Sequence, residues 1–359
     1  MTIKHLVIPG GGPVGLKALG ALQYLEQNGF WNIADIETIY ATSAGAIISV
    51  LLCLKFDWET INDYIIKRPW NEAFQLGVDQ IFEAYSKKGL FDKNIAEIFY
   101  KPFFNARDIS LKITLAEFYQ LSNIEIHLFS LDINNFNLED LSYITHPDLS
   151  LLTAVQMSSA IPIMISPVCV DDKCYVDGGV VCNYPINQCI LRAGDVNEIF
   201  GLRNKYIKND DNIVKEKSTI LEYIMNFIGK LVNNVSLRAE EQTIPNELIY
   251  EADSMNLSKI QLALSSKEVR QELIESGVEA GKAFLLAREK NAIDLAQPLL
   301  KVEDLDQPLL EIEDLAQPLL KVEDLAQPLT KVEDLDKPLL KVEDLAKLES
   351  TVEIIDAVF

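Results

Sequence analysis

The chain has 359 residues, 48% of them hydrophobic, and 54 Asp and Glu residues outnumber 32 Lys and Arg residues to give a net charge of −22. Such an acidic chain lacks the basic surface that binds nucleic acid, so no nucleic-acid partner is expected. The longest apolar run, Ala44 to Leu54, falls short of the roughly 20 residues that span a bilayer, which predicts no transmembrane helix.

A glycine-rich loop follows the first predicted strand, Leu6-Val7-Ile8. The loop reads Gly10-Gly11-Gly12-Pro13-Val14-Gly15, and a helix with leucines spaced along one face comes next. Glycine tolerates unusual dihedral angles, so successive amides of such a loop can point at one anion. In an acyl-transfer enzyme that anion is the tetrahedral oxyanion.

The same loop also fits a dinucleotide-binding fingerprint, Gly10-x-Gly12-x-x-Gly15. That site requires an acid at the end of the second strand, about 20 residues further on. Asp35 and Glu37 lie at this distance, but they precede or open the predicted strand, which runs instead into Thr42 and Ser43. Cofactor binding is therefore the weaker alternative, because a lone glycine pattern has low specificity.

Ser43 lies in a turn of small residues between a predicted strand, 36–40, and an apolar helix, 44–54. The turn reads Ala41-Thr42-Ser43-Ala44-Gly45, and small side chains suit a tight strand-to-helix reversal. Such a turn exposes the serine hydroxyl beside a helix N-terminus, where developing negative charge is favoured. The alternative is an ordinary serine N-cap.

An aspartate followed by two glycines, Asp177-Gly178-Gly179, comes after a predicted hairpin over 169–176. Apolar neighbours would raise the basicity of this carboxylate by desolvating its charged form. The alternative is a common aspartate turn. His5, His127 and His146 all precede Asp177, so the order serine, acid, histidine of an α/β-hydrolase triad is not available. If Ser43 is a nucleophile, it works with Asp177 as a dyad.

These elements together resemble the patatin-like phospholipases. The resemblance covers the first 185 residues in four ordered blocks, which are Gly10–Gly15, Thr42–Gly45, Ser158-Ser159-Ala160-Ile161-Pro162, and Asp177-Gly178-Gly179-Val180 with Asn183 and Pro185. It implies a lipid acyl hydrolase that acts without calcium on phospholipids or other lipid esters. Ser43 would be its nucleophile and Asp177 its general base. The amides of Gly10, Gly11, Gly12 and Gly15 would form the oxyanion hole.

Two positions depart from the family pattern. Val14 stands where the family usually has Arg or Lys in the glycine loop, with Lys17 one helical turn later, and Ala41 replaces the first glycine of the elbow. Neither change removes a group that performs chemistry. Both leave open a second hypothesis, a catalytically silent patatin-like scaffold that recruits partners through its C-terminal repeats.

Predicted strands and helices alternate through the first 290 residues. Further strands are expected at 124–131, 197–202 and 260–264, and helices at 149–158, 220–232 and 267–290. The alternation indicates an α/β fold, and the resemblance implies a three-layer sandwich with a mostly parallel sheet in one domain, 1–290, with core motifs at 6–190. The apolar stripe of 220–232 is a candidate lid or membrane-facing helix, with an ordinary core-facing helix as the more frequent alternative.

Beyond residue 290 a decapeptide repeats, with proline at 298, 308, 318, 328 and 338. Residues 291–359 hold 17 acidic and 6 basic side chains. Because proline disrupts helices, we expect a flexible or weakly helical tail, 291–359. It is either disordered without specific binding or an array that docks a protein partner multivalently.

Five cysteines form no CxxC pair, which indicates reduced thiols and an intracellular protein, cytoplasmic or peripheral at a membrane surface. Cys169 and Cys174 face each other across the predicted hairpin, but a disulfide there is the less favoured interpretation. The amino terminus lacks the pattern of a signal peptide. No residue cluster has metal-ligand spacing, so neither a metal nor a cofactor is expected.

Overall fold

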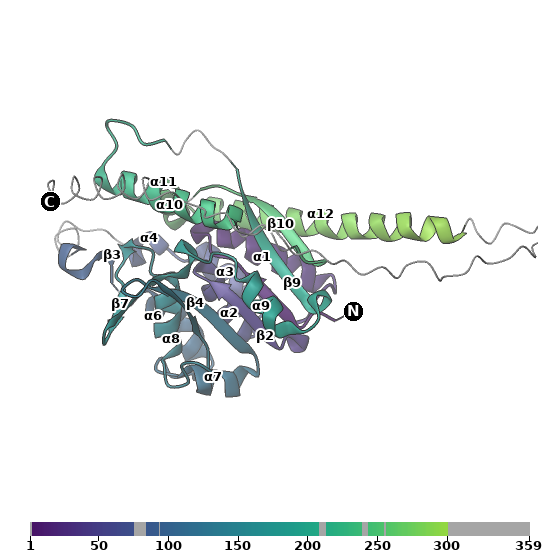
Figure 1. The fold of residues 1–359 in the computed structure, drawn as a ribbon, viewed down its shortest axis with the longest axis horizontal. Helices are drawn as coiled ribbons and strands as arrows, with labels where there is room; N and C mark the ends of the chain where they lie inside the picture. Colours follow the sequence, from purple (N-terminus) through teal and green to yellow (C-terminus); the bar gives the residue numbers. More distant parts are fainter. Residues whose placement is uncertain are drawn as a thin grey trace, which may run out of the picture. The chain divides into compact units, whose positions relative to one another are not determined.

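A mixed, mostly parallel sheet of eight strands forms the centre of the protein. The computed structural model describes residues 2–74, 84–92, 94–207, 213–238, 243–254 and 256–300. The sheet has the order β10-β9-β1-β2-β4-β8-β7, with β5 also paired to β4 (Figure 1). Strands β10, β9, β1, β2 and β4 run parallel, whereas β5, β7 and β8 are antiparallel to their partners. A separate two-stranded sheet pairs β3 with β6.

The strands are His5–Ile8 (β1), Thr38–Thr42 (β2), Gly89–Phe91 (β3), Glu125–Asp132 (β4), Asn137–Leu141 (β5), Ile163–Ile165 (β6), Val168–Val170 (β7), Lys173–Asp177 (β8), Ile199–Tyr206 (β9) and Glu247–Ala252 (β10). The helices are Gly15–Gln27 (α1), Ala44–Cys53 (α2), Trp58–Lys67 (α3), Trp70–Ala73 (α4), Ile95–Ala106 (α6), Leu115–Ser122 (α7), Leu151–Ser159 (α8), Ile186–Ala193 (α9), Ile220–Arg238 (α10), Leu257–Ser265 (α11) and Lys267–Leu300 (α12). Short 3-10 turns lie at Gly12–Val14 (η1), Ile33–Asp35 (η2), Gly178–Val180 (η3) and Val196–Glu198 (η4).

Helices cover both faces of the sheet, because alternate side chains of each central strand point to opposite faces. On β1, Leu6 and Ile8 join the larger apolar cluster, which contains residues of α1, α2 and α8. Val7 points the other way and packs in a smaller cluster with Ile186 and Cys189 of α9. The predicted three-layer α/β sandwich is thus confirmed.

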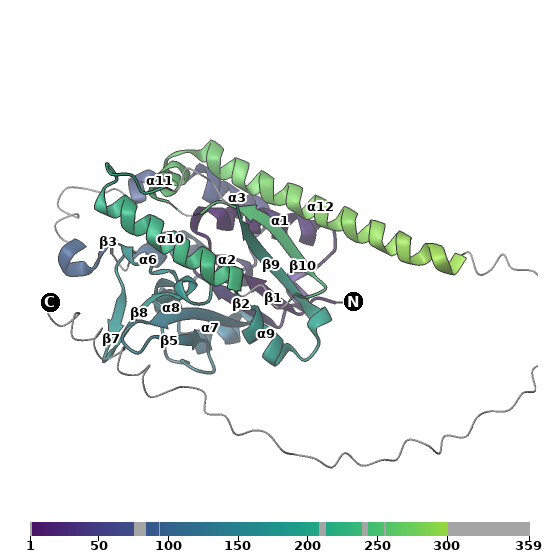
Figure 2. The ribbon, with the colours of Figure 1, turned by 45° about the horizontal axis from the view of Figure 1, so that its top comes forward.

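Helix α12 packs along α1 with its glycines at the contact (Figure 2). A Cβ atom on Gly20 of α1 would lie 2.0 Å from the carbonyl oxygen of Ile274, and one on Gly277 of α12 would lie 1.9 Å from that of Lys17. The two helix backbones therefore approach more closely than any larger residue would allow. The predicted helix 267–290 exists and continues to Leu300.

Residues 260–264, predicted as a strand, instead lie within helix α11. Asn256 caps this helix by accepting a hydrogen bond from the Lys259 amide. Ala263 faces the protein, whereas the Leu262 side chain is 52% exposed. A five-residue apolar run does not distinguish a strand from a short helix, and the cap at Asn256 was the signal that the prediction overlooked.

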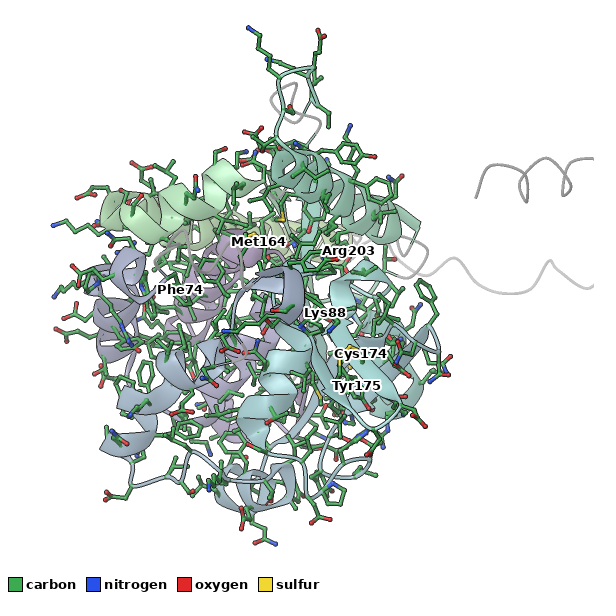
Figure 3. All side chains as sticks on the ribbon, turned by 90° about the vertical axis from the view of Figure 1, so that its left-hand side faces the viewer. Phe74, Lys88, Met164, Cys174, Tyr175 and Arg203 are labelled. Atoms are coloured by element: carbon green, nitrogen blue, oxygen red, sulfur yellow. A yellow bond between two sulfur atoms is a disulfide. The ribbon has the colours of Figure 1, made fainter. Side chains whose placement is uncertain are left out.

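The predicted hairpin forms from β7 and β8, in which Cys169 pairs with Cys174. A disulfide joins these two cysteines, while Cys53, Cys182 and Cys189 are free thiols. Cys174 lies beside Tyr175 on β8 (Figure 3). The expectation that all five thiols are reduced was therefore wrong, because the antiparallel register places residues 169 and 174 directly opposite each other.

Met1–Leu300 forms one compact unit. Residues 301–359, which contain most of the predicted repeat tail, lie outside the described residues. The division of the chain into a domain over 1–290 and a tail over 291–359 stays a prediction.

Candidate active site

The turn between β2 and α2 holds Ser43 in a backbone conformation that few residues other than glycine adopt. Its φ is 55° and its ψ is −120°. Such strain persists where the surrounding structure fixes it. Gly45, two residues on, packs so closely that a Cβ atom there would lie 2.3 Å from the carbonyl oxygen of Ile8. Ala41 is fully buried on β2, so its methyl group fits where the family has glycine.

Sheet register brings Ser43 to Asp177, although 134 positions separate them in the chain. Thr42, the last residue of β2, pairs with Phe129 of β4. The next residue of β4, Ser130, pairs with Asp177 at the end of β8. Ser43 and Asp177 are thus placed on the two sides of β4 at the same level, and Ser43 Oγ donates to Asp177 Oδ2 at 2.6 Å.

Asp177 is a buried carboxylate with two hydrogen-bond donors. Besides Ser43, the amide of Gly179 donates to its Oδ1 at 2.7 Å. Burial raises the pKa of Asp177 to about 6, although both donors act to lower it. A carboxylate with a pKa near neutrality accepts a proton far more readily than an ordinary aspartate and is still ionised at pH 7.

Two glycines of the loop lie at the same pocket. The amide of Gly10 donates to the carbonyl of Asn183, and the amide of Gly15 donates within the loop. Gly11 and Gly12 line the pocket with Ser43 and Asp177, and no described residue accepts a hydrogen bond from their amides. Of the four glycines predicted for an oxyanion hole, Gly11 and Gly12 line the pocket, and their role as donors stays a prediction.

Side chains from the ends of distant elements hold the loop in place. Asn183 Nδ2 and Asn204 Nδ2 both donate to the carbonyl of Gly10, and both also donate to the Tyr206 hydroxyl. Asn204 and Tyr206, on β9, were not predicted as site residues. The sequence gives no local signal for them, because Asn204 lies between Arg203 and Lys205 in the polar carboxyl half of the strand.

Ser158 braces the turn from helix α8. Its hydroxyl accepts a hydrogen bond from the Ser43 amide and donates to the carbonyl of Phe129. It contacts the backbone of Ser43 rather than its hydroxyl. Gly178, in the turn after β8, packs with no room for a side chain, since a Cβ atom there would lie 2.4 Å from the carbonyl oxygen of Phe129.

The position of the family's basic residue in the glycine loop holds an apolar side chain. Val14 is buried in the main apolar cluster. Lys17, one turn later, donates instead to the carbonyl of Glu251 on β10. Neither residue lines the pocket around Ser43, so the described part of the site carries no cation at the place where the family has one.

Two cavities adjoin the dyad. The one around Ser43 and Asp177 has a volume of about 30 Å³. The second has a volume of about 280 Å³ and shares Gly12 and Ile161 with the first. Its walls come mainly from apolar side chains of α1, α2, α6 and α11. The pocket of Ser43 and Asp177 thus has a larger, mostly apolar cavity beside it.

The three histidines have partners away from the dyad. His5 bonds to the Thr38 hydroxyl, and His146 contacts the Thr145 hydroxyl. His127 lies between Glu125 and Asp140. Among the described residues, no group of three or more His, Cys, Asp or Glu could hold a metal ion, and no helix is long and apolar enough to cross a membrane.

Residues 6–190 match the model of the patatin-like phospholipase family, and the chain belongs to this family. A probable lipid hydrolase, 463L, of Invertebrate iridescent virus 6 is 27% identical over 189 residues, which are 52% of this chain and 63% of the viral protein. Uncharacterized protein R571 of Acanthamoeba polyphaga mimivirus is 24% identical over 294 residues, 79% of this chain and 94% of that protein. Among solved structures, VipD from Legionella pneumophila has a TM-score of 0.49 at 17% identity, over 80% of this chain and 67% of VipD.

Proposed function

We propose that this protein hydrolyses carboxylic esters of lipids with a Ser43–Asp177 dyad. One observation carries the proposal: the Ser43 hydroxyl donates at 2.6 Å to a buried carboxylate whose pKa is raised to about 6. A nucleophile within hydrogen-bond distance of a base of suitable basicity is what acyl transfer requires. The family membership of residues 6–190 supports a lipid as the substrate class.

The geometry accommodates a two-step reaction. Ser43 Oγ attacks the ester carbonyl carbon while its proton passes to Asp177 Oδ2. The negative charge that forms on the carbonyl oxygen is stabilised by the amides of Gly11 and Gly12. As the tetrahedral intermediate collapses, Asp177 returns the proton to the departing alcohol oxygen and an acyl-serine ester remains.

Water completes the cycle through the same groups. Asp177 takes a proton from a water molecule, whose oxygen attacks the acyl carbon, and the two glycine amides again stabilise the oxyanion. Collapse of this second intermediate returns the proton to Ser43 Oγ and releases a carboxylic acid. Each oxyanion-hole donor is expected to contribute roughly 3 kcal/mol to the barrier reduction.

The larger cavity supports an acyl chain as the part of the substrate that is buried. It lies next to Gly12, one of the two oxyanion donors, so a chain placed in it would end with its carbonyl beside Ser43. Burying a chain methylene stabilises the complex by about 0.8 kcal/mol. Binding would therefore depend more on chain length than on head group.

A fluorophosphonate probe tests the proposal because it reacts only with an activated serine. We expect the wild-type protein to be labelled and Ser43→Ala to remain unlabelled. Ser49→Ala is the matched control, since Ser49 lies in the same helix and its hydroxyl donates only to the carbonyl of Ala46; this variant should be labelled like the wild type. A folded wild-type protein that is not labelled would instead identify a catalytically silent scaffold.

A further inference from the structure

Helix α10 closes the pocket above the dyad. Ile228, Gly229, Val232 and Asn233 of this helix line the cavity around Ser43. The pocket has a volume of about 30 Å³, against about 280 Å³ for the neighbouring cavity. A substrate with its acyl chain in the larger cavity would place its alcohol half in this small pocket, so a shift of α10 would enlarge the space beside Ser43.

The outward face of the same helix is also apolar. Its stripe, here called the outer stripe, consists of Ile220, Tyr223, Phe227 and Leu231, which are 74%, 49%, 53% and 39% exposed. Spacings of three and four residues place these side chains on one side of a helix. On the inward side, Met225 and Ile228 are buried. Helix α10 therefore has two apolar faces, whereas a surface helix ordinarily has one.

The outer stripe continues into the segment that precedes the helix, where Ile213 and Val214 are 54% and 41% exposed. These six residues are more than a third of the seventeen large apolar side chains that are exposed among the described residues. Elsewhere such residues are dispersed, as Leu191 is on α9 and Leu286 on α12. A concentration of exposed apolar side chains on one element marks an interaction surface.

Charge distinguishes this surface from the rest of an acidic protein. The stretch 213–232, which contains the outer stripe, holds three lysines, Lys215, Lys217 and Lys230. It holds two acidic residues, Glu216 and Glu222. The whole chain has a net charge of −22. Lysines with apolar stems and a tyrosine with a polar tip suit the boundary between water and hydrocarbon. The surroundings of the outer stripe therefore carry slightly more positive than negative charge, in a chain that is strongly acidic as a whole.

We propose that the outer stripe docks on the surface of a phospholipid bilayer and that docking holds α10 away from the dyad. The inner face of the helix covers the pocket and the outer face contacts the phase that contains the substrate, so one helix couples lipid binding to access. The coupling rests on the proposed hydrolase function, whereas the docking itself does not. Four apolar side chains inserted at the headgroup level suit reversible binding of an interfacial helix.

Binding to vesicles tests docking independently of catalysis. Full-length Ser43→Ala protein is sedimented with phosphatidylcholine vesicles containing a fraction of phosphatidylserine. We expect it to co-sediment, and we expect Tyr223→Ser/Phe227→Ser in the same background to bind at least about tenfold more weakly, since two exposed aromatic side chains are lost. Leu191→Ser is the control, because it removes an apolar side chain from α9 that is 84% exposed, more than Tyr223 or Phe227; it should bind like the parent. Equal binding by all three proteins, or binding by none, would overturn the docking surface.

Catalytic assays with Ser43 intact test the coupling. The Tyr223→Ser/Phe227→Ser protein should lose about tenfold in hydrolysis of vesicle phospholipid but keep wild-type activity on a short soluble ester. Equal loss on both substrates would contradict docking as the cause. If the wild type hydrolyses neither substrate while the double substitution still abolishes vesicle binding, the proposed function fails and the docking surface stands. Size-exclusion chromatography compares the oligomeric states of the two proteins. A dimeric wild type and a monomeric Tyr223→Ser/Phe227→Ser variant would instead assign the outer stripe to contact with a second copy of the chain.

Discussion

Two buried aspartates, at opposite ends of the paired stretch of β4 and β8, behave in opposite ways. Asp132 on β4 pairs with Tyr175, while Asp177 on β8 pairs with Ser130. Both side chains are nearly inaccessible to water, with residue exposures of 0% and 5%. Yet the pKa of Asp132 is lowered from its ordinary value, and that of Asp177 is raised to about 6.

The difference lies in the donors that surround each carboxylate. Burial acts to raise the pKa of Asp132, but the side chain of Asn135 and the amides of Cys174 and Asn134 all donate to it and outweigh burial. Lys173 adds a favourable charge. Asp177 has only Ser43 and Gly179 as donors, and burial prevails. A buried carboxylate with enough hydrogen-bond donors stays ionised and holds a turn in place. One with too few donors to offset the cost of burying its charge can accept a proton.

Asp177→Asn should cause the largest change, because it removes the base and leaves a side chain of the same shape. We expect kcat/KM for a soluble ester to fall by about 10²–10⁴-fold, the usual contribution of a general base. The variant should also unfold at higher temperature than the wild type at pH 8, since it no longer buries an ionised carboxylate. Because the pKa of Asp177 is raised in the folded protein, its protonation stabilises the fold. This contribution is complete below about pH 4 and is lost as the pH rises through about 6.

Thermal unfolding provides the control for that variant. A gain on the order of 3 kcal/mol in the free energy of unfolding at pH 8 corresponds to the raised pKa, and the gain should disappear near pH 4. An inactive variant that is also less stable at pH 8 would mean that Asp177 is a structural anion like Asp132, and the contrast between the two carboxylates would be lost.

The pH dependence of the wild-type enzyme should show the same carboxyl group titrating. Because only ionised Asp177 accepts the proton of Ser43, kcat/KM for a soluble ester should rise about tenfold from pH 5 to pH 7, with a midpoint at about 6. Initial rates across this range, at substrate concentrations well below KM, measure the midpoint. A midpoint near 4 would show that Asp177 is compensated as fully as Asp132 is.

Asp132→Asn should produce the smallest change in activity. Asp132 contacts no residue of the dyad, so kcat/KM should stay close to the wild-type value. Its lowered pKa stabilises the fold above its ordinary value near 4, and this contribution is lost as the pH falls through the lowered pKa. We therefore expect the variant to melt a few degrees below the wild type at pH 7, with a smaller difference in acid. Loss of activity without loss of stability would contradict a purely structural role.

Local sequence predicted that Ser43 and Asp177 come together, because the turns that hold them demand unusual residues. A serine in a turn that excludes larger neighbours, and an aspartate followed by two glycines, are both visible without coordinates. The turn at Ser43 requires glycine at position 45, because a Cβ atom there would collide with the backbone of Ile8. The turn after Asp177 requires glycine at position 178, because a Cβ atom there would collide with the backbone of Phe129. The alternation of strands and helices then indicated a layered α/β fold, which the sheet confirms.

What the sequence did not predict depends on contacts between distant segments. Asn204 and Tyr206 reach the glycine loop only because β9 lies beside β1 in the sheet. The amide of Gly10 is engaged by Asn183, 173 residues away in the chain, which no local pattern reveals. The face of α10 that covers Ser43 is likewise set by packing, since its apolar stripe alone is compatible with a core helix.

The close packing of α1 against α12 has a consequence for the newly made chain. Every group proposed to take part in catalysis is synthesised before β10, but Gly20 and Tyr24 of α1 lack their contacts until α12 is synthesised. The glycine loop leads directly into α1, so it is anchored at one end by a helix that is still incompletely packed. A nascent chain therefore carries the complete dyad before it can hold the oxyanion donors rigid, and hydrolysis should begin only once the C-terminal helix has docked.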